Sequence, residues 1–252
     1  MKPTESMNPH FIRLQQTDST NRYLREKAPE LPSLTIVTAE HQTAGRGQGS
    51  NTWESQAGQN LLFSILVRPQ NVLAAQQFVL SMAEGLAVRE AVKRLIGREK
   101  ELTLKWPNDL YWRDRKLGGT LIETVLEGRS VRQCIFGTGI NVNQTTFLSD
   151  APNPVSLHNI VGHNLDRQLL LQQVADSFCQ YYQLVEQGGA EEVRRQYLSV
   201  LYRRTGFHAY EDAEGRFLAQ VADVRADGQL ILEDTDGSQR AYYFKEVRHL
   251  IS

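Results

Sequence analysis

The sequence predicts an α+β fold in which a mixed sheet with helices is followed by a small, separate β-barrel. Residues 102–143 hold three or four strands in succession, and helices are expected before and after this segment in the sequence. From Thr205 onward, short apolar runs alternate with pairs of an acidic residue and a glycine, a pattern typical of hairpins. A chain of 252 residues can hold one large and one small domain, which we expect at residues 1–204 and 205–252.

The first part of the chain is expected to form strands, a short helix and a loop. Residues 10–30 predict a strand and then a helix that Asp18 or Ser19 can cap, because their side-chain oxygens can accept hydrogen bonds from the free amides of its first turn. Strands are expected within residues 31–41 and 60–69. Between them, residues 42–55 form a polar loop with three glycines.

The later elements follow from periodicity. Residues 73–96 lack an interior proline and are apolar on most sides, which predicts a helix packed against the sheet. In residues 166–187, apolar side chains recur at steps of three and four, as in an amphipathic helix, and a further helix is expected at about 190–202. The strands of residues 102–143 are expected to build the middle of one sheet.

Composition and charge argue against several classes of protein. The 28 basic residues nearly cancel the 29 acidic ones, so neither nucleic acid nor an anionic membrane is the expected main partner. The longest apolar run, residues 61–67, is too short to span a bilayer, and the first ten residues hold no apolar export signal. Cys134 and Cys179 lie in apolar surroundings, as free thiols do in a reducing compartment. We therefore expect a cytoplasmic protein.

Motifs of several common active sites are missing. The sequence has no P-loop, no complete dinucleotide-binding motif, no His/Cys cluster with metal-ligand spacing and no nucleophile elbow. Its scattered histidines are expected to be surface or core residues rather than ligands.

Polar groups instead gather at strand ends and in loops. The glycines of the polar loop let backbone amides approach an anion, and the loop carries one cation, Arg46. Lys105 ends an apolar strand before a rigid proline turn, which directs its ammonium to one place. Lys116 precedes two glycines, and Asn141 and Asn143 are expected on one face of a strand. The three cations are suited to a negatively charged substrate.

Four segments in this order identify a family. They are STN at residues 19–21, QTAGRGQ with the following tryptophan at 42–53, KWPNDLYWRDRKLGGTLIE at 105–123 and GTGINVN at 137–143. Together they resemble the biotin protein ligase family over about residues 11–250. The resemblance implies a class II synthetase-like catalytic domain of the biotin/lipoate ligase type. It also implies an SH3-like C-terminal domain.

The resemblance implies a two-step ligase reaction. Biotin and ATP would give biotinyl-5'-AMP and pyrophosphate, and the biotinyl group would pass to a lysine of the biotin carboxyl carrier domain of a carboxylase. Mg²⁺ would spread the phosphate charge. Two anions meet in the first step, so Arg46 and Lys105 are the implied catalytic cations.

The resemblance also implies the binding residues, but not the magnesium ligands. The biotin-binding residues would be Ser19, Thr20, Asn21, Gln42, Gly45, Arg46, Gly47, Gln48, Trp53, Lys105 and Gly118. The ATP-binding residues would be Arg46, Trp53, Lys105, Asn108, Asp109, Lys116 and Asn141.

The chain departs from the family at two points. Gln48 stands where some members carry a second arginine, which suggests a weaker hold on the adenylate. No aromatic residue in 151–159 matches the one that stacks on adenine in some members, so Trp112 or apolar contacts are expected to meet the base.

Other interpretations remain open. Only about ten residues precede the first expected strand, so we expect a monofunctional ligase without the DNA-binding domain of bifunctional members. A lipoate or octanoyl protein ligase shares the catalytic fold, and a biotin-binding sensor without turnover is the alternative outside the enzymes. The sequence leaves the oligomeric state open, a homodimer included.

Overall fold

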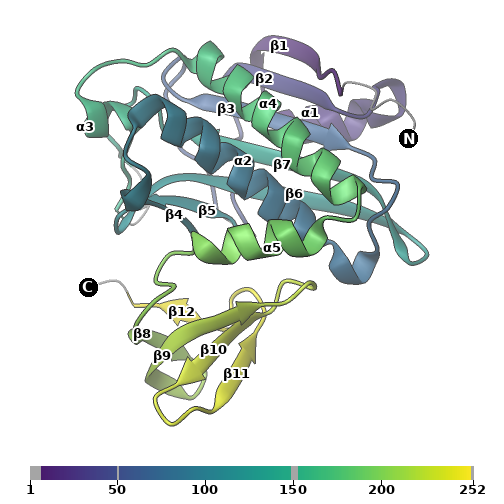
Figure 1. Ribbon diagram of the computed structural model, residues 1–252. Helices are drawn as coiled ribbons and strands as arrows, with labels where there is room; N and C mark the ends of the chain where they lie inside the picture. The colour runs from purple at the N-terminus through teal and green to yellow at the C-terminus, as the bar shows by residue number, and fades with distance from the viewer. Residues whose placement is uncertain (1–6, 50, 149–152, 251–252) are drawn as a thin grey trace.

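The computed structural model describes residues 7–49, 51–148 and 153–250, and within them the chain forms a seven-stranded mixed sheet (Figure 1). The strand order is β1-β2-β3-β7-β6-β5-β4. Strand β1 is parallel to β2, and the other neighbouring pairs in this sheet are antiparallel. The strand bounds are His10–Thr17 (β1), Thr35–Gln42 (β2), Leu61–Val67 (β3), Leu102–Lys105 (β4), Asp109–Trp112 (β5), Arg115–Glu127 (β6) and Ser130–Ile140 (β7).

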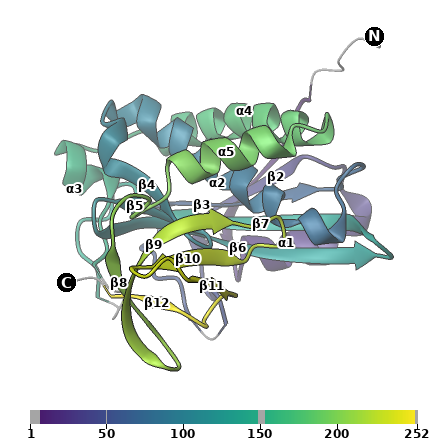
Figure 2. The same ribbon diagram turned by 60° about the horizontal axis from the view of Figure 1, so that its bottom comes forward.

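Helices cover both faces of this sheet. Figures 1 and 2 show α2, α4 and α5 as a layer on one face, and α1 packs on the other. Because it is covered from both sides, β3 is buried along its whole length. The α-helix bounds are Thr20–Lys27 (α1), Phe78–Ile96 (α2), Leu157–Val161 (α3), Arg167–Glu186 (α4) and Ala190–Ser199 (α5). Short 3-10 helices span Ala28–Glu30, Ala74–Gln76 and Glu99–Glu101.

Side chains of the central strand β7 alternate between these two faces. Phe136 packs in the core beneath the helix layer, whereas Ile135 joins Leu24 of α1 in a smaller cluster on the opposite face. The same alternation places Gly137 and Gly139 on the α1 face and Thr138 on the helix-layer face. This division decides which residues of β7 can meet a ligand.

A second, antiparallel sheet forms the last part of the described chain and confirms the expected hairpins. Its order is β11-β10-β9-β8-β12, and glycines with positive φ occupy its turns at 215, 228 and 237. It lies next to α5 (Figure 1), where Arg194 donates to Asp223. The bounds are His208–Asp212 (β8), Gly215–Val224 (β9), Leu230–Asp234 (β10), Gln239–Tyr242 (β11) and Arg248–His249 (β12).

The two sheets are joined directly. Trp106 Nε1 donates to the carbonyl of Gly228 at 2.9 Å. Gly228 has a φ of 96°, and a Cβ at this position would lie 2.8 Å from the ring of Phe78. The turn between β9 and β10 therefore requires glycine both for its backbone conformation and for its close contact with α2.

Several expected elements differ in the structure. The strands of residues 102–143 are not all central, because β1, β2 and β3 pair on the far side of β7 and leave β4 at the edge. Helix α5 ends at Ser199, since the following residues pair with β4 through Leu201. Ser19 occupies the N-cap position of α1 but makes no capping hydrogen bond with its side chain, and Asp18 accepts from the amide of Ser19 itself.

Two further expectations concern membranes and cysteines. Among the described residues, no helix is long and apolar enough to cross a membrane. Cys134 and Cys179 are free thiols, as expected, and burial raises their pKa values to about 12 and about 11.

Candidate functional site

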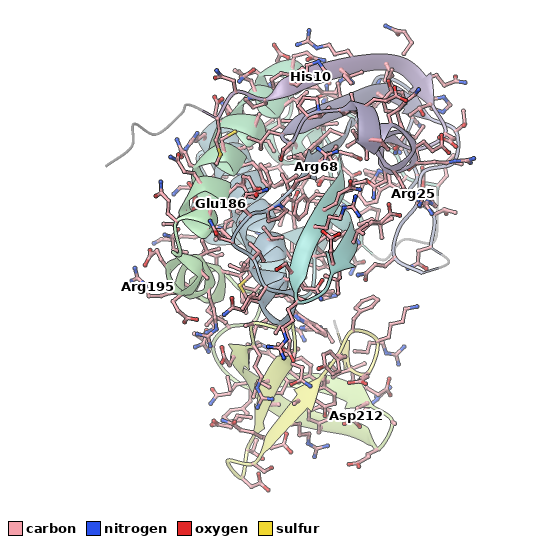
Figure 3. All side chains as sticks on the ribbon, turned by 90° about the vertical axis from the view of Figure 1, so that its right-hand side faces the viewer. His10, Arg25, Arg68, Glu186, Arg195 and Asp212 are labelled. Atoms are coloured by element: carbon pink, nitrogen blue, oxygen red, sulfur yellow. The ribbon has the colours of Figure 1, made fainter. Side chains whose placement is uncertain are left out.

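A cleft of about 900 Å³ lies between the α1 face of the first sheet and the second sheet. Figure 3 shows the second sheet, which carries Asp212, below the part of the molecule that carries Arg25. Most of the residues that the sequence singled out line this cleft: Ser19, Thr20, Asn21, Gln42, Arg46, Gly47, Gln48, Trp53, Lys105, Asn108, Asp109, Lys116 and Asn141.

A neutral polar cluster occupies the part of the cleft next to β3. Gln42 Oε1 accepts from the backbone amide of Thr20 at 2.7 Å and from its hydroxyl at 3.0 Å. Ser64 Oγ lies 2.7 Å from both Thr20 Oγ1 and Asn21 Oδ1. Asn21 Nδ2 donates to the carbonyl of Leu121 on β6. Thr20, Asn21 and Ser64 are buried, Gln42 is half-buried, and the four side chains are fixed by one another, so the cluster is a rigid site for a neutral polar group.

The floor of the cleft is made of backbone where β6 and β7 pass beneath it. A Cβ on Gly137 would lie 1.9 Å from Asn21 Oδ1, and one on Gly139 would lie 2.4 Å from the ring of Trp53. Trp53 therefore lies flush against β7. Its Nε1 lies against Gly139, is buried and has no hydrogen-bond partner among the described residues.

Arg46 reaches the cleft from the glycine-rich loop and is paired. Its guanidinium lies 3.2 Å from Glu123 Oε1 on β6, and Arg25 of α1 approaches the same oxygen at 3.3 Å. An anionic ligand that binds Arg46 must compete with this carboxylate.

Lys105 and Lys116 bring positive charge to the β4–β5 edge. Lys105 Nζ lies 3.4 Å from the hydroxyl of Tyr111. Burial lowers the pKa of Lys105, Asp109 opposes this effect, and Lys116 and Arg203 add to it. Lys116 pairs with Asp109 at 2.7 Å. A desolvated ammonium of this kind interacts strongly with an incoming anion.

The two asparagines are engaged with backbone rather than free. Asn108 Nδ2 donates to the carbonyl of Thr120, and Asn141 Nδ2 donates to that of Val155 at 3.1 Å. Asn141 and Asn143 follow the end of β7 at Ile140 instead of lying on a strand face. Their amides hold the loops around the cleft.

Three expected contacts are placed elsewhere. Gly45 pairs with Trp53 within the loop, where a Cβ would lie 2.8 Å from the Trp53 carbonyl oxygen. Gly118 lies on the helix-layer side of β6, and Gly119 lines the cleft instead. Trp112 belongs to the core and does not line the cleft, so the expectation that it meets adenine is not supported. Of residues 151–159, Ala151 and Pro152 lie outside the described residues.

Sequence reasoning missed the contribution of the second sheet. Its lining residues are Phe244, Lys245, Val247, Arg248 and His249, and Phe147 adds another aromatic ring from the loop after β7. Burial, followed by the charges of Lys105 and Arg203, lowers the pKa of His249 to about 3, so this histidine is neutral. The segment FKEVRHL contains all five residues, but nothing local in the sequence shows that it folds back over the cleft.

Lys245 of the second sheet is unusual in its backbone conformation and in its position beside the glycine-rich loop. Its φ is 74°, which is uncommon for a residue with a side chain. Its Nζ would be 2.7 Å from a Cβ on Gly49, so the lysine reaches the glycine-rich loop. No carboxylate pairs with it among the described residues.

No group of three or more metal-ligating side chains occurs in the described part of the chain. The carboxylates that line the cleft are those of Glu54 and Asp109. Such a set suits a cation that arrives on phosphate oxygens and takes one or two protein ligands, as Mg²⁺ does with nucleotides. It does not suit a resident transition-metal centre.

Comparison with known proteins gives the family. Residues 13–141, just over half of the chain, match the biotin/lipoate A/B protein ligase family. The bifunctional ligase/repressor BirA of Bacillus subtilis is 30% identical over 95% of this chain and 74% of its own length. A biotin acetyl-CoA-carboxylase ligase of Paracoccus denitrificans is 32% identical over 74% of this chain and 78% of its own.

A solved structure agrees with these relatives. The biotin protein ligase of Aquifex aeolicus in complex with biotin and ATP superposes with a TM-score of 0.79 at 26% identity, covering 96% of this chain and 99% of that one. The chain belongs to the biotin/lipoate A/B protein ligase family.

Proposed function

We propose that this chain is an ATP-dependent biotin protein ligase, which forms biotinyl-5'-AMP and transfers the biotinyl group to a lysine of a carboxylase's biotin carboxyl carrier domain. Family membership supports the reaction type. The observation that carries the proposal is that one cleft holds a rigid neutral polar cluster and a separate set of cations.

The separation of these two sets suits a ligand with two parts. Ser64 lies on β3 and Lys105 on β4, and four strand-to-strand steps separate β3 from β4 in the sheet order. At about 4.8 Å per step, the backbones of β3 and β4 lie about 19 Å apart, and Lys116 on β6 falls between them. A ligand with a neutral polar end, an apolar middle and an anionic end would match this order.

In this proposal, biotin occupies the part of the cleft next to β3. Ser19, Thr20, Asn21 and Gln42 would hold its ureido group, and Trp53 would cover its tail. Glycine at positions 137 and 139 supports this placement, because a side chain there would clash with Asn21 and with Trp53 and displace both from the cleft wall. Burial of the apolar ring and tail then supplies most of the affinity.

The activation step is proposed to be electrostatic. A biotin carboxylate oxygen attacks the α-phosphorus of ATP, the bond to the bridging oxygen breaks and pyrophosphate leaves. Arg46 and Lys105 would offset the repulsion between the two anions, while Asn108, Asp109, Lys116 and Asn141 would hold the nucleotide side. Bound with ATP, Mg²⁺ would neutralise phosphate charge, and Asp109 is the candidate protein ligand.

The transfer step requires the acyl group to be reachable from outside. The amine of the acceptor lysine attacks the acyl carbon, AMP leaves and the nitrogen loses a proton to form an amide. No enzyme side chain becomes covalently linked, so catalysis rests on positioning and charge.

Lys245 offers an answer to the scarcity of charge in the glycine-rich loop. Gln48 leaves that loop with Arg46 as its cation, and Lys245 of the second sheet reaches the same loop at Gly49. We propose that Lys245 supplies part of the positive charge that holds the adenylate. Phe147 and Phe244 are the proposed aromatic contacts for adenine in place of Trp112.

The proposal extends to organisation and setting. The division at residues 204 and 205 falls between α5 and β8 and leaves one sheet on each side. The two free thiols suit the cytoplasm. A homodimer would have an available edge at β1, which pairs with β2 on one side only among the described strands.

Pyrophosphate exchange with ATP tests the function. We expect the exchange to depend on biotin. We expect that lipoate does not replace biotin in this assay. Exchange supported by lipoate alone would favour the lipoate ligase alternative. Tight binding of biotin without exchange would favour a sensor.

A further inference from the structure

A carboxyl group is buried directly behind the floor of the cleft. Glu84 of α2 is 2% exposed. Thr138 Oγ1 of β7 lies 2.6 Å from Glu84 Oε1, and Thr120 Oγ1 of β6 lies 3.0 Å from Oε2. The two threonine hydroxyls are 3.1 Å apart. The three side chains therefore close a ring of polar atoms that links one helix to two strands.

The ring lies on the opposite side of the strands from the ligand. Thr120 alternates with Gly119 on β6, and Thr138 lies between Gly137 and Gly139 on β7. These glycines face the cleft, where the floor is backbone. Strand segments rich in glycine are poorly restrained by their own side chains, so hydrogen bonds on the other face add to the restraint that Asn21 and Trp53 supply from the cleft side.

The number of hydrogens in the ring depends on the protonation of Glu84. With an ionised carboxylate, both threonine hydrogens are used to reach it and the threonines cannot bond to each other. A neutral carboxyl adds a third hydrogen, and all three contacts can then be hydrogen bonds. The neutral form thus ties β6 to β7 directly as well as to α2.

We propose that Glu84, Thr120 and Thr138 form a hydrogen-bonded ring that fixes the cleft floor, with Glu84 as a positioning residue for biotin; the role for biotin rests on the function proposed above. A cavity of about 20 Å³ adjoins the ring and is shared with Lys105, Asn108 and Asp109. It has the size of one water molecule. An ionised Glu84 would therefore be hydrated from the side of the catalytic cations.

Several titratable groups surround the ring. Lys105 and Asp109 face the ring across the cavity, and Tyr197 faces it from α5. The charge of Glu84 adds to the raised pKa of Cys134 on β7. Burial raises the pKa values of Tyr197 and Cys134 away from neutrality. Burial also raises the pKa of Glu84 to about 7, against which its two hydrogen bonds act.

The first test compares the wild type with Glu84→Gln, which keeps the shape and the three bonds but cannot titrate. We expect the wild-type KM for biotin in pyrophosphate exchange to rise about two- to tenfold from about pH 6 to about pH 8.5, the range for one lost hydrogen bond. Glu84→Gln should remove this rise without a matching change in kcat. Thr124→Val, on the same face of β6 but outside the ring, is the control and should keep it. The same pH dependence of KM in the wild type and Glu84→Gln would overturn the proposal.

A second measurement does not require activity. Amide hydrogen exchange of residues 118–122 and 136–140 should accelerate above pH 7, beyond its intrinsic pH dependence, in the wild type and not in Glu84→Gln. Thr138→Val should exchange faster than the wild type, and Thr138→Ser should restore protection. If biotin does not support pyrophosphate exchange, the proposed function fails. Amide hydrogen exchange would still show whether the hydrogen-bonded ring fixes the cleft floor. Equal protection in the Val and Ser variants would refute the ring.

Discussion

The guanidinium of Arg46 and the carboxylate of Glu123 lie 3.2 Å apart at the cleft. The pair is partly solvated, with side-chain exposures of 43% and 27%, so it contributes no more than about 1 kcal/mol. A phosphate can displace such a partner. The glycine-rich loop is thus held by a contact weak enough for a substrate to replace.

We expect Glu123→Gln to lower the KM for ATP by about two- to fivefold, because Arg46 no longer has to leave a carboxylate. Glu127→Gln, at the exposed end of the same strand, is the matched control and should leave the KM unchanged. Pyrophosphate exchange at varied ATP concentration measures both. A higher KM in Glu123→Gln would mean that Glu123 orients Arg46 for the ligand.

Lys105→Ala should reduce adenylate formation by a factor of ten to a hundred or more, because a hydrogen bond to a charged group contributes about 1.5 to 3 kcal/mol. The fold should persist, since the substitution removes a desolvated charge and costs only one long contact, with the buried hydroxyl of Tyr111. Lys27→Ala, which removes an exposed cation of α1, is the control. Unchanged exchange rates in Lys105→Ala would refute its assigned role.

Gly139→Ala should weaken biotin binding by about tenfold or more, because its Cβ would lie 2.4 Å from the Trp53 ring and displace it. A double-mutant cycle with Trp53→Ala identifies the cause. If the clash is responsible, the two effects on the biotin Kd should be strongly non-additive. Additive effects would place the role of Gly139 elsewhere.

Burial of Glu84 should also make the free energy of unfolding depend on pH. Its pKa is raised from 4.5 to about 7 on folding, so the folded state binds its proton more tightly. The associated stabilisation is complete below about pH 4.5 and is lost as the pH rises through 7, by about 3 kcal/mol. Urea unfolding across this window should show the loss relative to Glu84→Gln. Parallel curves for the two proteins would contradict it.

Lys245→Ala should accelerate release of biotinyl-5'-AMP by about three- to tenfold, and Gln48→Arg should slow it, because both change the charge at the loop. The effect should diminish at high salt. Arg216→Ala removes an exposed cation elsewhere in the second sheet and is the control. Equal release rates in the wild type, Lys245→Ala and Gln48→Arg would show that neither residue retains the intermediate.

Local patterns predicted the elements well and their neighbours less well. The helical periodicity of residues 166–187 predicted α4 almost to its ends, and the turns at glycines predicted the hairpins of the second sheet. The position of β4 at the sheet edge depends on β3 pairing with β7, a contact between distant segments that no local pattern encodes. The same reason explains why Ser64 was missed, since it reads as one polar residue in an apolar strand and becomes informative only beside Thr20 and Asn21.

For the candidate site, sequence reasoning found the residues that carry charge or stand in the family's motifs. It did not find those whose importance comes from the other face of the sheet. Glu84 looks like one charge in a helix until its threonine partners are known. Phe244 and Lys245 lie in the turn between β11 and β12, more than a hundred residues from the motifs. Packing between the two sheets brings them over the cleft, including the contacts of Trp106 with Gly228 and with the ring of Phe244.

The contact between Trp106 and Gly228 also bears on how the molecule unfolds. It joins the turn before β5 to the β9–β10 hairpin of the second sheet. The cleft is lined by side chains of that turn and by residues 244–249 of the second sheet. A molecule bound there touches both halves and lowers the free energy only of the state in which they are together. Heating the protein with ligand should therefore give one sharper, later heat-absorption peak, even if the empty protein melts in two.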